Sequence, residues 1–436
     1  MSRSGINAEL LRWLETKQIK HEIKIEFEDS FNELSKNFLN AVTDARRLTS
    51  AEDLAEIILK KNGLDELIRI RKEVRKLELK RAISYSKQTD HSAHSLYVYL
   101  LGLYIYKCSP VMMSTLGDDF HRFLFPWVYA GLLHDVGYIF SEPISALPSS
   151  RGLLERFFEL WRIEELAKPT TPYDDNDFKE FISFVQKLKS QANWQDPCYS
   201  RCDYPIDILD ELRKIPWIER FELGLDTDAF RLFQQCVSEN SIPTYMLENY
   251  AYKVAISGYD EKSNPEIDHA IASSLFLLQY CSYWYWLSVE SQKVKDKSWC
   301  YKYICEERLD FSKNNLPNKI IPALYSVACH NVLPSRHEGK YILPIRLEAD
   351  PLTYLLVLCD ILQIWDRFPA GTKYLDDLDS FSEFALISEE VNLSCSNNLI
   401  VFEIKSNSTK FKEDLINNLN QRLVDWKTII EIKFTN

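Results

Sequence analysis

Six side chains of metal-binding type lie inside or at the ends of the most apolar stretches of this chain. Burying several unpaired imidazoles and carboxylates costs free energy, unless the groups pair with one another or bind a metal ion. A single histidine on an apolar face is more often a satisfied core residue, but a group of this size favours metal binding. Imidazole and carboxylate ligands together suit Zn, Fe, Mn and similar ions. The six residues are His94, His134, Asp135, His269, His330 and Asp360.

The adjacent pair His134 and Asp135 bears on the number of metal ions. Neighbouring side chains on a helix point about 100° apart, so one ion could not easily take both as ligands. Two neighbouring ions could do so if Asp135 bridged them. Two-metal sites activate water and hold both the entering and the leaving oxygen of a phosphoryl transfer. The pair therefore favours a dinuclear centre bridged by Asp135, the kind of site that can serve phosphoryl transfer.

Five apolar segments would have to bring these residues together. A helix that is apolar on all sides is expected to be central and buried. Helix bundles host metal sites because side chains from facing helices converge in their cores. The sequence therefore predicts a mainly α-helical core. The segments are residues 92–106, 123–140, 267–287, 320–329 and 351–365.

The two ends of the chain differ from this core. The first 80 residues have helical periodicity, with an interruption near Asn62 and Gly63. Near the C-terminus, residues 389–394, 399–405 and 428–434 have strand character, and residues 410–426 have helical periodicity. The sequence thus predicts a small α+β appendage. We expect three regions: a helical N-terminal region (1–80), a core (81–370) with an insert at about 141–266, and a tail (380–436).

The order of these motifs resembles the HD-domain superfamily of metal-dependent phosphohydrolases. The resemblance rests on His94-Ser95, on the segment Leu132-Leu133-His134-Asp135-Val136-Gly137 and on the distant Asp360, and it covers about residues 85–368. It implies an HD-type helical bundle and a metal-bound hydroxide as nucleophile. It also implies two divalent transition-metal ions (Mn, Fe, Zn, Co or Ni). The first would be held by His94, His134, Asp135 and Asp360, and the second by Asp135, His269 and His330.

The chain departs from the family pattern in ways that bear on the substrate. Tyr138 stands where many relatives have a basic residue that can contact phosphate. The insert at 141–266 is far longer than in compact members and could form a lid or a specificity module. The extended His/Pro/Gly motif of the deoxynucleoside triphosphohydrolase branch is not found. Another branch uses a diiron site for oxygenation, so this ligand set does not guarantee hydrolysis.

Two residues beside the proposed ligands are candidates for catalysis. His91 precedes His94 by three positions, on the same helical face. Either could be the first ligand, and Ser95 and the more apolar setting favour His94. His91 would then protonate a leaving group or contact phosphate, unless it is a surface histidine at a helix start beside Asp90.

The second candidate is Arg367, which follows Asp360 on one helical stripe together with Gln363. Its guanidinium could clamp a phosphate through two hydrogen bonds. The alternative is a structural ion pair with Asp366 or another acid.

The charge of the chain limits its partners. The formal net charge of −12 argues against extended nucleic-acid binding, which needs a basic surface. A local exception is residues 60–81, with nine basic and four acidic side chains, a net charge of +5. This stretch is either a solvated helix face or a wall that attracts anions.

Composition and the polar N-terminus indicate a cytoplasmic protein. Hydrophobic residues make up 46% and charged residues 27%, which is ordinary for a globular protein. The first residues contain no apolar signal-peptide core. The ten cysteines are scattered, which favours reduced thiols. The apolar run 123–140 contains Pro126, His134 and Asp135, which favours a buried segment over a membrane span.

The sequence therefore predicts an HD-type metal-dependent phosphohydrolase or phosphodiesterase. Its expected substrate is a nucleotide, a cyclic nucleotide or a short oligonucleotide. Two alternatives remain: an HD-fold diiron oxygenase, and a non-catalytic nucleotide-sensing or scaffold protein. The expected partner is a phosphorylated small molecule or short oligonucleotide, with no membrane involved, and homo-oligomerisation is left open.

Overall fold

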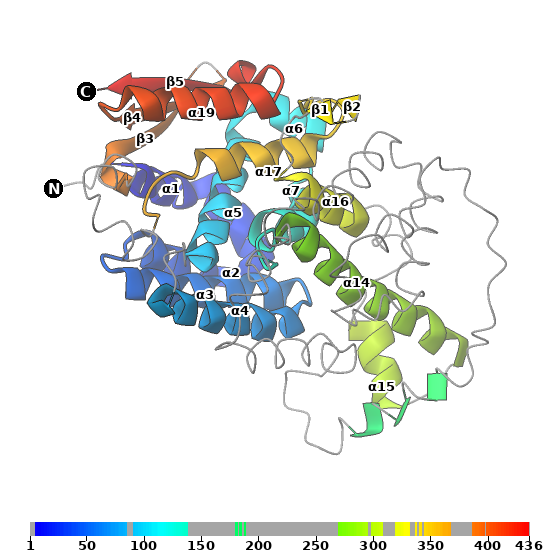
Figure 1. The fold of residues 1–436 in the computed structure, drawn as a ribbon. Coiled ribbons are helices and arrows are strands. Elements are labelled where there is room, and N and C mark those ends of the chain that lie inside the picture. The colour runs from blue at the N-terminus through cyan, green and yellow to red at the C-terminus, as the bar shows by residue number, and fades with distance from the viewer. Residues whose placement is uncertain are drawn as a thin grey trace. The chain divides into compact units, whose positions relative to one another are not determined.

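The structure is a computed structural model, and the part of the chain it describes is mainly helical (Figure 1). The chain divides into two compact units. The first unit comprises Met1–Lys61, Arg71–Asp135 and His330–Asn436, and the second comprises Asn62–Ile70 and Val136–Cys329. The domain ranges expected from the sequence stay a prediction. The described residues are 5–84, 90–137, 179–181, 183–184, 187–188, 269–294, 298–307, 319–331, 336–337, 340–341, 344–367, 386–396 and 398–435.

Helices make up most of the first unit. They include α1 (Ile6–Leu14), α2 (Lys17–Leu39), α3 (Asp44–Lys61), the larger part of α4 (Asp65–Ser84), α5 (His91–Cys108), α6 (Pro110–Leu116), α7 (Phe120–Trp127), the π-helix η1 (Val128–Leu132) and α17 (Pro351–Leu362). The predicted interruption between α3 and α4 is confirmed, and Gly63 takes a positive φ of 66° there. Only glycine adopts such a conformation without steric cost.

Helix α5 is the centre of the first unit. Every residue from His91 to Tyr106 is buried, as the uniformly apolar sequence predicts. Helices α3 and α17 and the π-helix η1 all pack against it (Figure 1). Two glycines allow a close approach to the Trp127 ring: a Cβ at Gly102 would lie 2.0 Å from it, and one at Gly131 would lie 2.7 Å from it. The indole N–H of Trp127 also donates to the carbonyl of Tyr99 at 3.0 Å.

The segment 123–140 is not a single helix, so this expectation was wrong. Helix α7 ends at Trp127, the π-helix η1 follows it, and His134 and Asp135 lie in the turn beyond. Pro126 lies inside α7, and a proline ring disrupts regular helical hydrogen bonding around it. Single-turn π-helices often occur at functional sites. The helical spacing of about 100° therefore does not apply to His134 and Asp135.

Helix α17 begins with a buried carboxyl cap. Asp350 precedes the helix and its Oδ1 accepts a hydrogen bond from the backbone N–H of Thr353 at 3.2 Å. Burial raises the pKa of Asp350 to about 6, against the lowering effect of its bonds to Thr353. The raised pKa means that the folded state favours the protonated carboxyl.

The Asp350→Asn variant is expected to be more stable than the wild type at pH 8, by about 1–3 kcal/mol, since each pKa unit is worth about 1.4 kcal/mol. Asparagine keeps the cap without the charge. The folded-state pKa lies above the unfolded value, so the wild type loses stability as the pH rises from about 4 through 6. The gain should therefore shrink towards pH 4. Thermal unfolding of both metal-free proteins across this range tests it, and an equal difference at every pH would contradict the assignment.

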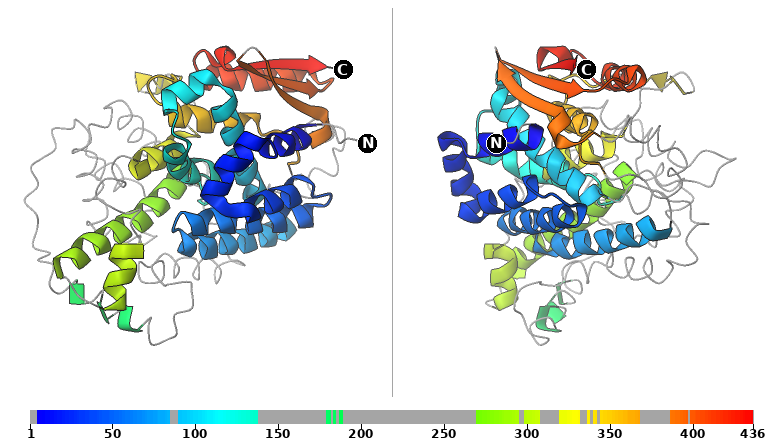
Figure 2. Two further views of the ribbon diagram at one scale, coloured as in Figure 1. Left: turned by 180° about the vertical axis from the view of Figure 1, so that it is seen from behind. Right: turned by 90° about the vertical axis from the view of Figure 1, so that its left-hand side faces the viewer.

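The C-terminal appendage belongs to the first unit and agrees with the predicted α+β pattern. Its sheet has the order β3-β4-β5, formed by β3 (Val391–Ser396), β4 (Leu399–Lys405) and β5 (Ile430–Thr435). Strands β3 and β4 are antiparallel, whereas β4 and β5 are parallel and joined through α19 (Thr409–Arg422). Figure 2 shows α19 running alongside this sheet. The Tyr354 hydroxyl of α17 donates to the Val424 carbonyl at 2.9 Å, which ties the appendage to the core of the unit.

The second unit has its own buried core. Its described elements include α14 (His269–Val294), α15 (Trp299–Lys302), the π-helix η5 (Tyr303–Glu307) and α16 (Ile321–Cys329). Helices α14 and α16 pack together, and Ser274 donates to the Leu324 carbonyl at 2.8 Å. The buried Glu66 carboxylate accepts bonds from the Tyr280 and Tyr303 hydroxyls, at 2.6 and 3.2 Å. Most of the predicted insert 141–266 lies outside the described residues.

Among the described residues, no single helix has the length and apolar character needed to cross a membrane. The bent pair α5 and α6, which turns by 99°, passes the same test of length and composition only when taken together.

Candidate metal centre

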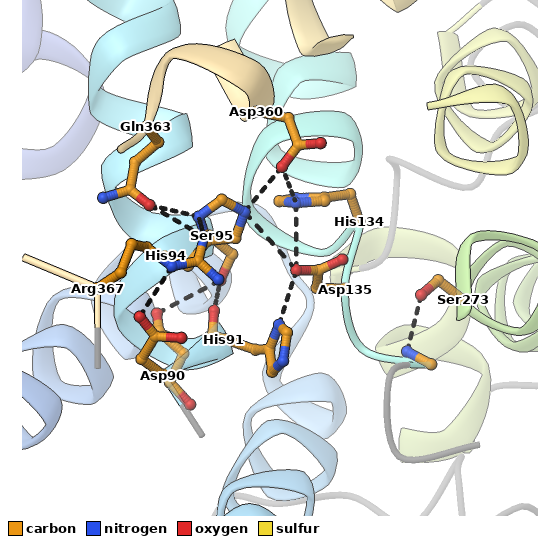
Figure 3. A network of polar contacts seen from close by, with 12 residues as sticks. Asp90, His91, His94, Ser95, His134, Asp135, Ser273, Asp360, Gln363 and Arg367 are labelled. Atoms are coloured by element: carbon orange, nitrogen blue, oxygen red, sulfur yellow. Dashed lines mark hydrogen bonds and ion pairs between the residues drawn. The ribbon is translucent and has the colours of Figure 1, made fainter. Parts of the chain in front are cut away.

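Five residues of the first unit converge from four places in the chain, and Figure 3 shows four of them, His94, His134, Asp135 and Asp360. His94 comes from the second turn of α5, and His134 and Asp135 from the turn after η1. Asp360 lies near the end of α17, and His330 follows the last residue of α16. The ligand atoms of His94, His134 and Asp135 all lie within 4.8 Å of one another. These buried groups could hold a metal ion, as the sequence predicted.

Asp135 lies at the middle of the cluster and presents its two oxygens to different histidines. Its Oδ2 is 3.5 Å from His134 Nε2 and 3.8 Å from His94 Nε2. Its Oδ1 is 3.6 Å from His330 Nε2. A carboxylate whose oxygens face separate sets of nitrogens has the arrangement that a bridging ligand needs.

Asp360 closes the other side of the cluster. Its Oδ1 is 2.9 Å from His94 Nε2 and 3.9 Å from His134 Nε2 (Figure 3). Oδ1 of Asp360, Oδ2 of Asp135 and the Nε2 atoms of His94 and His134 therefore face one another.

The electrostatics of the cluster favour anionic carboxylates and a neutral His134. Burial lowers the pKa of His134 to about 3, although Asp135 acts in the opposite direction. Burial alone would raise the pKa of Asp135, but the imidazoles around it, including the hydrogen-bond donor His91, hold that pKa well below its usual range. Burial likewise opposes ionisation of Asp360, and the hydrogen bond from His94 keeps its pKa low.

The clearest sign of a cation comes from His134, whose side chain is 0% exposed. Its Nδ1 lies 3.1 Å from the Gly131 carbonyl, which can only accept, so Nδ1 carries the proton. Its Nε2 therefore presents a lone pair, and it has no hydrogen-bond partner among the described residues. The groups it faces are carboxylate oxygens of Asp135 and Asp360, at 3.5 and 3.9 Å, which also only accept.

A cation between these acceptors resolves the conflict. Metal–ligand bonds of about 2.1 Å place tetrahedral ligands about 3.4 Å apart. The separations of 3.5 and 3.9 Å at His134 are close to this value. A buried, desolvated acceptor that faces only acceptors would otherwise cost about 1–3 kcal/mol. The residues present therefore fit a divalent ion.

His94 has two contacts that require opposite tautomers. Its Nδ1 is 2.6 Å from the Gln363 amide oxygen, which can only accept. The same nitrogen contacts Nη1 of Arg367, which can only donate. Gln363 is held in this orientation because its Nε2 donates to the Trp365 carbonyl at 2.6 Å. A cation at Nε2 of His94 would select the Nδ1–H form, and such bonds commonly orient metal-ligating histidines.

The structure favours the ion-pair interpretation of Arg367. Its Nε lies 2.9 Å from an Asp90 carboxylate oxygen, and its Nη1 donates to Gln363 Oε1 at 3.1 Å. Its partner is thus Asp90, not Asp366. The expected helical stripe was wrong, because α17 ends at Leu362 and Arg367 lies beyond a turn. Direct phosphate contact by Arg367 stays a prediction.

His91 is buried, so the surface alternative was wrong, although the residue does begin α5 beside Asp90. Its Nδ1–H donates to Asp135 Oδ2 at 3.0 Å (Figure 3). His91 thus contacts the same carboxylate that faces His134 on one side and His330 on the other. His91 therefore lies at the site, as expected from the sequence, and it contacts the candidate ligand Asp135.

Sequence reasoning missed the role of Asp366, which fixes the chain just after α17. Asp366 takes a positive φ of 54°. Its carboxylate accepts bonds from Asn7 at 3.0 Å, from the Tyr97 hydroxyl at 3.0 Å and from the Ser388 backbone N–H at 3.1 Å. These partners come from three segments far apart in sequence, so no local pattern could have revealed them. An aspartate directly after the apolar segment 351–365 was the one available signal.

The remaining predicted residues are less completely described. His269 begins α14 of the second unit, so its ligand role stays a prediction. Tyr138 lies outside the described residues. In the basic stretch 60–81, Lys60 and Lys72 pair with Glu56, at 2.7 and 2.6 Å, and these bonds lower the pKa of Glu56. These two lysines thus fit the solvated-face interpretation.

Compared with protein-family models, with curated proteins and with solved structures, the chain matches none of them.

Proposed function

We propose that the chain is a metal-dependent phosphohydrolase or phosphodiesterase of the HD type. The observation that carries the proposal is the lone pair of His134 Nε2, which faces carboxylate oxygens of Asp135 and Asp360 in a buried cluster. The order His94, His134-Asp135, Asp360 along the chain adds the resemblance to that superfamily. We expect a nucleotide, a cyclic nucleotide or a short oligonucleotide as substrate.

In this proposal, His94, His134, Asp135 and Asp360 hold one divalent cation. His330 and the second oxygen of Asp135 would hold another, and the resemblance adds His269 as a further ligand. A bound divalent cation supplies Lewis acidity, which lowers the pKa of a coordinated water towards 7 and neutralises charge on phosphate oxygens.

Groups of the protein prepare this chemistry in three ways. The Gly131 carbonyl fixes the tautomer of His134. The Gln363 amide oxygen does the same for His94 when a cation occupies Nε2. His91 holds the Asp135 carboxylate through Nδ1, and we assign to it proton delivery to the leaving oxygen.

Metal content and turnover test the proposal together. We expect close to two transition-metal ions per chain by mass spectrometry of protein purified without chelator. After loading with Mn or Co, the protein should hydrolyse at least one member of a panel of mononucleotides, cyclic nucleotides and short oligonucleotides. Chelation should stop turnover, and added metal should restore it.

Other outcomes of the same experiment would support the rivals. Iron together with oxygen consumption, and no hydrolysis, would favour the diiron oxygenase. No metal after soaking with Mn, Fe, Zn or Co would refute the metal centre and favour a non-catalytic sensor or scaffold.

A further inference from the structure

A buried arginine outside the candidate ligand set connects the two segments that carry most of the ligands. Arg71 lies in α4, within the first unit, and is only 4% exposed. Its guanidinium bonds to four groups: Glu52 Oε1 at 3.1 Å, Ser95 Oγ at 3.1 Å, the Leu132 carbonyl at 3.0 Å and the Ser92 carbonyl.

The positions of these partners matter more than their number. Ser92 and Ser95 lie in the first two turns of α5, on either side of His94. Ser95 extends this hydrogen-bond network to His91, because its hydroxyl donates to the His91 carbonyl at 2.8 Å. Leu132 is the last residue of η1, two residues before His134. One guanidinium thus bonds to both backbone segments from which His91, His94, His134 and Asp135 project.

The bond to Leu132 answers a specific need of the π-helix. The last carbonyls of a helix lack partners within that helix and need donors from elsewhere. Arg71 supplies one at the point where the chain leaves η1 for the His134 turn. A planar guanidinium suits this role because its donors diverge in a fixed geometry, which a lysine ammonium lacks.

Glu52 compensates the buried positive charge of Arg71. Its carboxylate is buried in α3 and pairs with Arg71 Nε. Such buried pairs often add little net stability compared with apolar residues of similar size. A role in geometry accounts for the pair better than a role in stability alone.

We propose that Arg71 is a positioning residue for the metal centre. It holds the first two turns of α5 against the end of η1, at the separation that lets His94 and His134 share one cation with Asp135. This inference rests on the proposed metal centre, but it concerns a residue that contacts no ligand side chain.

Metal affinity and the coordination spectrum of the full-length protein test this role. We expect Arg71→Lys to weaken Co(II) binding by about 10- to 100-fold, the usual cost of losing a group that orients ligands. The visible absorption of bound Co(II) should also change, because it reports ligand geometry. A merely stabilising residue would alter neither property in protein that remains folded.

Two further variants keep the test decisive. The double variant Arg71→Met/Glu52→Met removes the pair without leaving an unpaired buried charge, so it should fold even if Arg71→Lys does not. Arg75→Met is the matched control, because Arg75 lies one turn further along α4 and donates to the Leu48 carbonyl of α3 at 3.1 Å. We expect the double variant to lose Co(II) affinity and the control to keep it.

Folded Arg71 variants with wild-type Co(II) affinity and spectrum would overturn the inference. Equal losses in Arg75→Met would overturn it as well, since they would indicate a general effect on α4. Absence of Co(II) binding by the wild-type protein would refute the metal centre itself, and this inference with it. The two failures are therefore distinguishable.

Discussion

Replacing Asp135 by asparagine is expected to remove most bound metal and to lower phosphoester hydrolysis at least about 100-fold. Loss of a group that merely orients ligands commonly costs 10- to 100-fold, and loss of a ligand should cost more. Asp135 presents Oδ2 to His94 and His134, and Oδ1 to His330. An amide carries no charge and has only one acceptor oxygen. It can therefore serve one of these two groups, and its NH₂ would face the other.

Asp350→Asn is the matched control for this variant. Asp350 is also a buried aspartate, but it caps the start of α17 and is not a member of the cluster. Metal per chain, measured by mass spectrometry, should fall in Asp135→Asn and stay at the wild-type level in Asp350→Asn. Circular dichroism would verify that both variants are folded. Full metal occupancy in folded Asp135→Asn would show that the ligand assignment is wrong.

The buried helices of the first unit could be predicted because their sequence allows few alternatives. All described side chains from His91 to Tyr106 are buried, and the segment is apolar on every face. A helix of that composition must lie inside a protein, and residues on it must face other residues. The same reasoning correctly placed His94 and Asp360 on buried helices. Composition thus limited where these two residues could lie.

The local geometry around His134 could not be predicted in the same way. The apolar run continues through Trp127 without a polar residue, so the sequence indicated one long helix. The π-helix begins two residues after Pro126, beside the packing of Trp127 over Gly102 and Gly131. Those contacts join residues of separate helices, and hydrophobic periodicity contains no information about them. The sequence identified the candidate ligands, but not the turn that presents His134 and Asp135.

Arg71 and Asp366 illustrate a second limit of the sequence. In sequence, Arg71 was one of nine basic residues in a stretch with a solvated alternative. In the structure it is buried and bonds to Leu132, 61 residues away. Asp366 accepts a hydrogen bond from Asn7, 359 residues away. A polar residue with such distant partners looks like an ordinary surface residue until the fold is known.

Removing the metal is expected to destabilise the protein, and this effect separates a true metal centre from a cluster of mutually bonded core residues. A ligand present at about 1,000 times its Kd stabilises the folded state by about 4 kcal/mol. For a unit of this size, that corresponds to a Tm shift on the order of 5–10 °C. The expectation follows from His134, because without a cation its buried Nε2 faces the acceptor oxygens of Asp135 and Asp360.

The measurement is the Tm of chelator-treated protein against added Mn or Co. We expect the Tm to rise with metal concentration in the wild type and in Asp350→Asn, and to stay constant in Asp135→Asn. If the histidines and aspartates were satisfied by one another, the wild type would give the same Tm with and without metal. That result would mean that the five residues converge for packing alone, and neither hydrolysis nor oxygenation could then be based on them. If added metal raises the Tm only in proteins that retain Asp135, the metal centre is established and the reaction it catalyses is the next question.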